Sequence, residues 1–194
     1  YAIDKAEISE GLTYGYEGIA DIPFTLDSPY SDVPLNTKFT HDADKASGLL
    51  EETGWIMNES KGIREKDGQS LRIVLTMDES FDSLNKPLAT LLKNQLKEVG
   101  IDLTVKSQEK MEWYYGFMEG KFDITIWQPQ YAYASPHCWF TPMPVMTPQT
   151  PALAAMSERD EFFVAIDEFS TKTDEPERLR EIFTYLINYD LDNV

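Results

Sequence analysis

Residues 71–105, LRIVLTMDESFDSLNKPLATLLKNQLKEVGIDLTV, contain the pattern that decides the fold. Apolar side chains alternate through residues 71–77 and again through residues 101–105, which predicts two strands. Leucines at helical spacing lie between them, and Pro87 fits a helix only in its first turn, so we expect this helix to begin near Asn85. A strand, a helix and a strand with short connections predict a right-handed parallel crossover. The fold class is therefore α/β, a mixed sheet with flanking helices.

Residues 121–146, KFDITIWQPQYAYASPHCWFTPMPVM, form the second informative stretch. Alternation through residues 122–127 predicts a strand, and the regular pattern ends at Pro129. The segment that follows is rich in rings, small residues and prolines. A loop of this length inside a compact domain is either functional or disordered, and this one is too aromatic to be disordered. We interpret it as a ligand-facing loop that the strand delivers to the end of the sheet.

Helical spacing marks further segments on both sides of this pattern. They are residues 2–12, 42–54, 109–118, 160–169 and a final helix after residue 174. Asp42 and Asp174 stand where side chains cap helix starts. Trp55 and Ile56 are expected to anchor the packing after the second helix, and Asp67 with the following glycine predicts a turn before the next strand.

Size and charge narrow the range of functions. The chain has 194 residues, of which 42% are hydrophobic, enough for one domain with a sizeable core. Asp and Glu number 34 against 17 Lys and Arg, giving a formal charge of -17, which disfavours nucleic acid as a partner. No apolar run is long enough to span a bilayer. The chain starts without Met or a signal peptide, so we expect it to be an excised piece of a longer protein.

The sequence offers few candidates for catalysis or metal binding. The sequence contains no G-x-S-x-G, P-loop or G-x-G-x-x-G motif, which gives no support for an enzyme or a bound cofactor. His41 lies among aspartates before a helix, where a solvated turn is the simpler interpretation. His137 beside Cys138 is a candidate metal ligand, with a backbone-bonded histidine as the alternative. A single cysteine excludes an internal disulfide.

Aromatic residues around the strand at 122–127 indicate binding. Trp113 and Tyr114 precede that strand, and residues 131–139 follow it with several rings. Binding pockets use rigid rings with a few polar groups, so residues 131–139 are predicted to contact a ligand. We expect Phe140, and at least one of Trp113 and Tyr114, to point into the core instead.

Several phrases, taken in order, resemble one family along nearly the whole chain. They are YAIDKAEI, DADKASGLLEETGW, DGQSLRIVLTM, LLKNQLKEVGIDLTVKS and GKFDITIW. The sequence is similar to the extracytoplasmic solute-binding proteins of ABC importers that take up peptides and nickel. That family has two lobes joined by a hinge, with the ligand trapped between them. The resemblance implies that residues 1–194 are a single lobe, the carboxy-terminal ligand-closing lobe.

Within this family the nickel-binding branch is the most similar. GIREKDGQSLRI resembles that branch, as do Pro136 and His137 followed by aromatic residues. A tyrosine ahead of the key strand lines the pocket there, and Tyr114 falls at its place. Tyr133 stands where the peptide-binding branch has an aspartate for the ligand's free amine, which argues against ordinary peptides.

The chain also departs from the nickel-binding branch. Gln130 and Ala134 replace a tryptophan and a tyrosine of the pocket, and Pro148 stands where a metal-contacting histidine falls. His137 resembles a different histidine, so the resemblance gives it no metal contact. A metal wrapped in a small organic chelator would need few protein ligands.

These observations lead to one expected function and two alternatives. We expect the solute-binding component of an ABC importer that captures nickel or a metal–chelator complex and delivers it to a permease. The longer protein is expected in the periplasm or at the outer face of the membrane. Whether a lipid anchors it there is left open. The expected ligand-binding residues are Tyr114, Gln130, Tyr131, Tyr133 and His137. An oligopeptide or opine ligand is the alternative within the family, and a fragment of a hydrolase or transferase is the alternative outside it.

Overall fold

The computed structural model describes residues 1–22, 29–80, 83–127, 140, 157–172 and 174–193. Backbone proximity divides the chain into two compact units, which are residues 1–19 with 39–127 and residues 20–38 with 128–194. We call the first the sheet unit and the second the helix-pair unit. No helix in the described ranges is long and apolar enough to cross a membrane. The expectation that residues 1–194 form one lobe of a larger protein stays a prediction.

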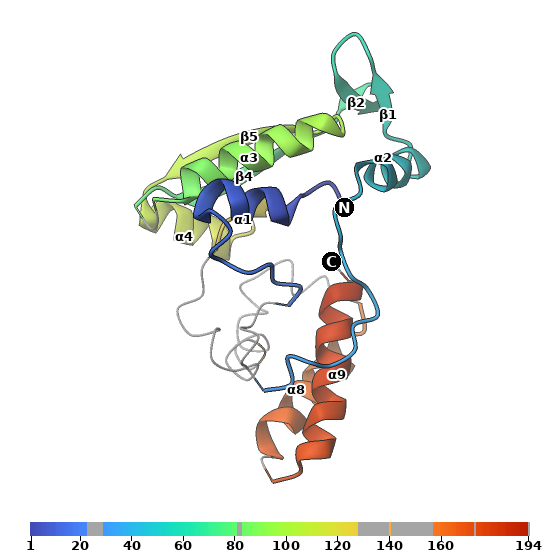
Figure 1. Ribbon diagram of the computed structural model, residues 1–194, viewed down its shortest axis with the longest axis vertical. Helices are drawn as coiled ribbons and strands as arrows, with labels where there is room; N and C mark the ends of the chain where they lie inside the picture. Colours follow the sequence, from blue (N-terminus) through green and yellow to red (C-terminus); the bar gives the residue numbers. More distant parts are fainter. Residues whose placement is uncertain (23–28, 81–82, 128–139, 141–156, 173, 194) are drawn as a thin grey trace. The chain divides into compact units, whose positions relative to one another are not determined.

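A parallel sheet forms the centre of the sheet unit (Figure 1). Its strands are β5 (Asp102–Gln108), β4 (Arg72–Asp78) and β6 (Ile124–Thr125), in that order across the sheet. The register of β4 and β5 runs from Arg72 opposite Asp102 to Asp78 opposite Gln108. Helix α3 (Asn85–Glu98) connects these two strands. The predicted strand, helix and parallel strand are therefore confirmed, including the helix start at Asn85.

Burial explains why β4, α3 and β5 could be predicted from the sequence. Leu75, Met77 and Leu103 of the sheet pack with Ala89 and Leu96 of α3 in one buried cluster. The β-strand residues that alternate with them face the other side of the sheet, because successive side chains of a strand point to opposite faces. The α/β class predicted from this alternation is confirmed.

An antiparallel sheet precedes the parallel one in the chain. Its strands are β1 (Ile56–Asn58), β2 (Ile63–Lys66) and β3 (Gln69–Ser70). Asp67 and Gly68 join β2 to β3 with φ values of 51° and 78°, as a tight hairpin turn requires, so the predicted turn is confirmed. The sequence pattern did not indicate β1 or β2. Ile56 is 58% exposed, so its predicted role as a packing anchor is wrong.

Two capped helices complete the sheet unit on its amino-terminal side. Helix α1 (Lys5–Thr13) begins three residues later than predicted. It follows Asp4, whose side chain accepts hydrogen bonds from the amides of Ala6 and Glu7. Helix α2 (Ala43–Glu52) begins after Asp42, whose carboxylate accepts a 2.8 Å bond from the amide of Lys45. The predicted cap of the second helix is confirmed.

The helix-pair unit is built on two helices with an aromatic core. They are α8 (Arg159–Thr171) and α9 (Pro176–Asp192). Phe140 is fully buried against Phe162 and Phe183, with ring centroids 6.0 and 6.1 Å away, so its predicted inward position is confirmed. The predicted cap of the last helix is wrong. Glu175, not Asp174, precedes α9, and its side chain makes no capping hydrogen bond.

Candidate functional site

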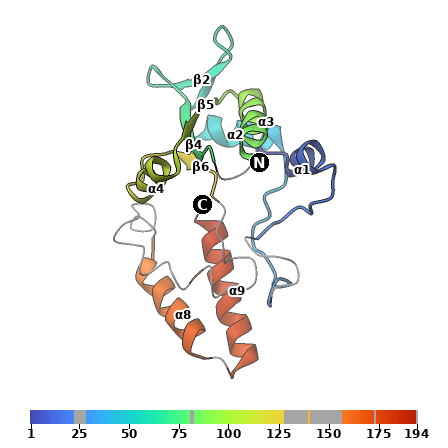
Figure 2. The same cartoon turned by 90° about the vertical axis from the view of Figure 1, so that its left-hand side faces the viewer.

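The carboxyl edge of the parallel sheet has the topology of a ligand site. The connections from β4 to β5 and from β5 to β6 cross the sheet in opposite directions, because β4 lies between β5 and β6. Right-handed crossovers then place the two connecting helices on opposite faces, as Figure 2 shows for α3 and α4 (Lys110–Met118). The chain therefore leaves β4 and β5 in diverging directions after Asp78 and Gln108. Open α/β sheets bind ligands at such a switch point.

Helix α4, predicted at residues 109–118, is fixed to the sheet by a side-chain relay. Trp113 Nε1 donates a 3.0 Å hydrogen bond to Thr125 Oγ1 of β6. Thr125 Oγ1 in turn lies 3.0 Å from the carbonyl oxygen of Thr76 in β4, to which it donates. One indole therefore links the helix to two neighbouring strands. Trp113 is the member of the Trp113 and Tyr114 pair that points inward, as expected.

Stacked rings extend this attachment toward the end of β6. Phe117 of α4 stacks on Trp113 at 5.7 Å, on Phe122 at 5.7 Å and on Trp127 at 5.6 Å between ring centroids. We call these four residues the aromatic cluster. Trp127 is the last described residue before the aromatic segment and is 43% exposed. The aromatic cluster therefore presents a tryptophan at the point where the chain leaves the carboxyl edge.

Helix α4 presents a second set of apolar side chains on its exposed face. Tyr114 and Tyr115 are 46% and 58% exposed, and their rings meet edge to face at 5.9 Å. Met111, on the preceding turn, is 55% exposed. Large exposed apolar side chains gathered on one short helix are typical of a binding surface. Tyr114 is thus available to a ligand, as its predicted role requires.

The other predicted ligand-binding residues, Gln130, Tyr131, Tyr133 and His137, lie outside the described residues, as does Cys138. The metal role considered for His137 therefore stays a prediction. His41 is described, and its Nδ1 lies 3.4 Å from Oδ2 of Asp4, the cap of α1. Within the described ranges, no three His, Cys, Asp or Glu side chains gather closely enough to hold a metal ion.

Asp78 is a candidate that sequence reasoning missed. It ends β4 at the switch point and is only 3% exposed. Its Oδ1 accepts hydrogen bonds from the amide and the hydroxyl of Ser80, at 2.8 and 2.7 Å. Its Oδ2 is buried and has no hydrogen-bond partner among the described residues. A carboxylate that closes an apolar strand is the signal that could have drawn attention to it.

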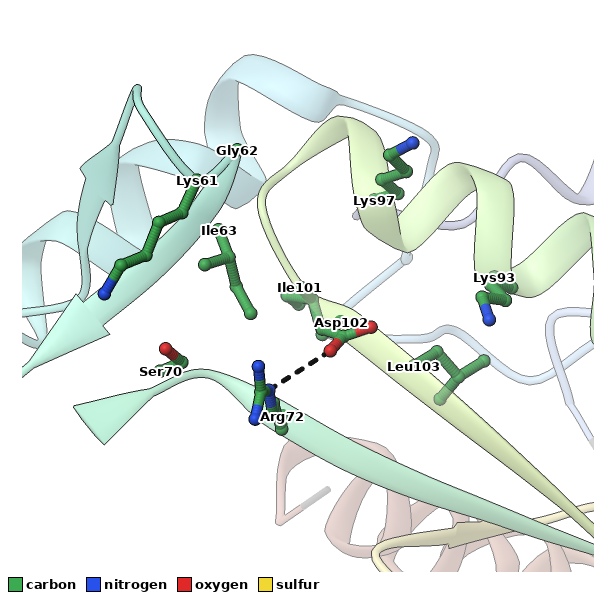
Figure 3. Close-up of a pocket in the computed structure, with 10 residues that line it drawn as sticks. All are labelled: Lys61, Gly62, Ile63, Ser70, Arg72, Lys93, Lys97, Ile101, Asp102 and Leu103. Carbon is green, nitrogen blue, oxygen red and sulfur yellow. Dashed lines mark ion pairs between the residues drawn. The ribbon is translucent and has the colours of Figure 1, made fainter.

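A cavity of about 470 Å³ lies at the opposite, amino edge of the same sheet (Figure 3). Its lining includes the first residues of β4 and β5, which are Arg72 and Asp102. Asp78 lies six positions after Arg72 in β4, which corresponds to about 20 Å along a strand. The cavity is therefore distinct from the carboxyl-edge site.

Comparison with known proteins identifies the class of this chain. Residues 1–148 match the family described as bacterial extracellular solute-binding proteins, family 5 Middle. The chain belongs to this family, which groups solute-binding proteins and not enzymes. That membership agrees with the lack of a catalytic motif in the sequence.

Individual relatives include nickel- and peptide-binding proteins. The nickel-binding periplasmic protein of Escherichia coli strain K12 is 31% identical over 145 residues, covering 75% of this chain and 27% of the relative. The oligopeptide-binding protein OppA of Lactococcus lactis subsp. cremoris strain SK11 is 36% identical over 114 residues, covering 58% of this chain and 19% of the relative. The chain thus spans about a quarter or less of these curated relatives.

Solved structures show the same fold. NikA from Brucella suis, in complex with Fe(III)-EDTA, superposes with a TM-score of 0.83 and 27% identity, covering 97% of this chain and 38% of that one. The oligopeptide-binding protein AppA from Bacillus subtilis, in complex with a nonapeptide, gives 0.72 with 18% identity, covering 99% and 38%. The expected family and fold are confirmed, and the ligand remains to be assigned.

Proposed function

We propose that this chain is the carboxy-terminal, ligand-closing lobe of a binding protein that captures nickel or a metal–chelator complex for an ABC importer. The carboxyl edge of the parallel sheet forms one wall of the cleft in this proposal. Closure of the two lobes over the ligand then signals the permease. The site of action is the periplasm or the outer face of the membrane, in keeping with the family to which the chain belongs.

The observation that supports the proposal is the group of exposed rings at the carboxyl edge. Tyr114 and Tyr115 of α4, and Trp127 just after β6, each expose more than two fifths of their surface. Flat, rigid rings contact the organic part of a chelate over a large area at little cost in conformational entropy. A chelator that already fills most coordination positions of the metal leaves few for protein side chains. The lack of a multi-ligand metal cage among the described residues is compatible with such a ligand.

The choice of nickel over peptide is supported by two relatives. One is the nickel-binding protein of E. coli, and the other is NikA, whose structure holds a metal chelate. The peptide alternative is favoured by OppA, because its sequence identity to this chain is higher than that of the nickel-binding protein, although over a shorter segment. Tyr133 in place of an amine-binding aspartate weighs against that alternative.

Titration calorimetry on the whole protein distinguishes these ligands. Nickel–histidine, free nickel and a short peptide are titrated separately. We expect the nickel–histidine complex to bind with the highest affinity, because the rings contact the chelator and the metal keeps its own ligands. Tight binding of the peptide in the absence of metal would contradict the proposal and favour the peptide alternative. Turnover of any of these compounds would instead favour the hydrolase or transferase alternative.

A further inference from the structure

The cavity at the amino edge of the parallel sheet concentrates positive charge. It lies within the sheet unit, where the antiparallel hairpin, the starts of β4 and β5 and the last turns of α3 meet (Figure 3). Lys61, Arg72, Lys93 and Lys97 line it, and Asp102 is the single carboxylate among its lining residues. The whole chain carries a formal charge of -17, so this cavity is a basic site in a strongly acidic chain.

Protein carboxylates neutralise only part of this charge. Arg72 Nε lies 3.2 Å from Asp102 Oδ2, and Lys61 forms an ion pair with Glu65 on the hairpin. Lys93 and Lys97 are exposed, and neither forms an ion pair within the described residues, although the chain has twice as many acidic as basic residues. They lie four positions apart on one face of α3, where like charges repel and weaken the helix. The cavity therefore retains positive charge that an anion would balance.

The chemistry of these groups fits phosphate. Ammonium groups bind phosphate oxygens as point charges, and a guanidinium offers a planar pair of donors to the same group. Arg72 uses its Nε toward Asp102, which orients the guanidinium in the cavity. A volume of about 470 Å³ is within the range of small-molecule sites and exceeds the needs of a bare phosphate ion.

We propose that this cavity binds a phosphate group carried by a small organic moiety, either a soluble phosphate ester or a phospholipid headgroup. This site is separate from the proposed nickel site, because about 20 Å of β4 lies between Arg72 and the carboxyl edge. The inference therefore does not rest on the identity of the transported ligand.

The test uses the whole protein in two experiments. Calorimetry at low salt measures the binding of inorganic phosphate and of glycerol phosphate. Flotation measures binding to vesicles of phosphatidylglycerol or of phosphatidylcholine. The variant Lys93→Gln with Lys97→Gln removes the two unneutralised charges. Its matched control, Lys86→Gln with Lys106→Gln, removes two exposed charges of α3 and β5 outside the cavity. We expect the cavity variant to weaken binding about tenfold and the control to leave it within about twofold.

The outcomes distinguish the sources of the phosphate. Binding of the soluble phosphates that only the cavity variant loses supports a soluble ester. Binding to phosphatidylglycerol vesicles alone, again lost only in the cavity variant, supports a headgroup. No binding of any probe at about 10 mM, or equal losses in both variants, overturns the proposal. The affinity for nickel–histidine should be the same in all three proteins, which keeps this test independent of the proposed function.

Discussion

Trp113 and Thr125 are joined by a 3.0 Å hydrogen bond from the indole Nε1 to the threonine Oγ1, and this bond fixes α4 against β6. The side chains of Tyr114 and Tyr115 follow Trp113 directly on the helix. Neighbouring residues of a helix point about 100° apart. When Trp113 faces the sheet, the two tyrosines are therefore turned toward solvent, where they are 46% and 58% exposed. One half-buried hydrogen bond thus sets the orientation of the proposed binding surface.

Replacing Thr125 by valine should loosen this helix. The side chain keeps its shape but leaves the half-buried indole N–H without its acceptor, and Thr76 O loses the hydroxyl donor. We expect a loss of about 1–3 kcal/mol in the free energy of unfolding, measured by urea denaturation with tryptophan fluorescence. Thr104→Val, at an exposed position of β5, is the control and should change stability by less than about 0.5 kcal/mol. Equal stability of the two variants would show that the bond does not hold α4.

Tyr114→Ala should lower ligand affinity without destabilising the fold. Its ring is nearly half exposed, so its removal leaves no closed cavity in the core. We expect about a tenfold loss of affinity for nickel–histidine in the whole protein, measured by calorimetry, with an unchanged unfolding midpoint. Tyr16→Ala removes another tyrosine of the sheet unit, 93% exposed and remote from α4 in sequence, and should leave the affinity unchanged. An unaltered affinity in the Tyr114 variant would remove this residue from the site.

Arg64 is predicted to be the most sensitive charged residue of the sheet unit. The residue is only 2% exposed. Its Nε donates a 2.7 Å hydrogen bond to the carbonyl of Val99, and one terminal nitrogen donates a 2.9 Å hydrogen bond to the carbonyl of Trp55. Arg64→Met leaves both carbonyls without this donor and should cost about 2–4 kcal/mol in urea denaturation. Arg64→Lys should rescue little, because an ammonium cannot reproduce the planar donor arrangement.

Arg72→Met is the matched control for Arg64→Met. Arg72 begins the neighbouring strand β4, but its side chain is 69% exposed and its pair with Asp102 is screened by water. We expect it to change stability by less than about 1 kcal/mol. If the two arginine variants were equally stable, the backbone contacts of Arg64 would not contribute to the fold as described.

The sequence was most informative where a long pattern serves a single buried face. Leucines of α3 and the alternating residues of β4 and β5 meet in one cluster, so periodicity identified all three elements. Strands β1 and β2 were not predicted because they have only three and four residues. Ile56 faces solvent and the adjacent Ile63 and Arg64 are both buried, which leaves no alternation to detect. Strand β2 is paired with β3 through the turn at Asp67 and Gly68, and the hydrogen bond from Arg64 to the carbonyl of Val99 anchors β2 to the end of α3.

The sequence predicted only part of the candidate site, because the rest depends on tertiary contacts. Tyr114 follows from its place on α4, but the isolation of Asp78 Oδ2 depends on how Ser80 turns back to Oδ1. The cavity at the amino edge of the sheet brings together Lys61, Arg72 and Lys93 from separate segments. No local pattern connects such residues, because only the tertiary fold brings them together.

Glu65 forms an ion pair with Lys61, which lines the cavity at the amino edge of the parallel sheet. Hydrogen bonds from Lys61, then from Asn58 at 2.8 Å and Ser70 at 3.1 Å, lower the pKa of this carboxyl from 4.5 to about 2. Because the folded-state pKa is lowered, the stabilisation is fully present above pH 4.5 and is lost as the pH falls through about 2. NMR titration of the Glu65 carboxyl should report the low pKa, and Lys61→Met or Asn58→Ala should raise it toward 4.5. Lys106→Met, on β5, changes the net charge equally without touching Glu65 and should leave the pKa in place; a midpoint near 4.5 in the unaltered protein would contradict the contacts of the hairpin.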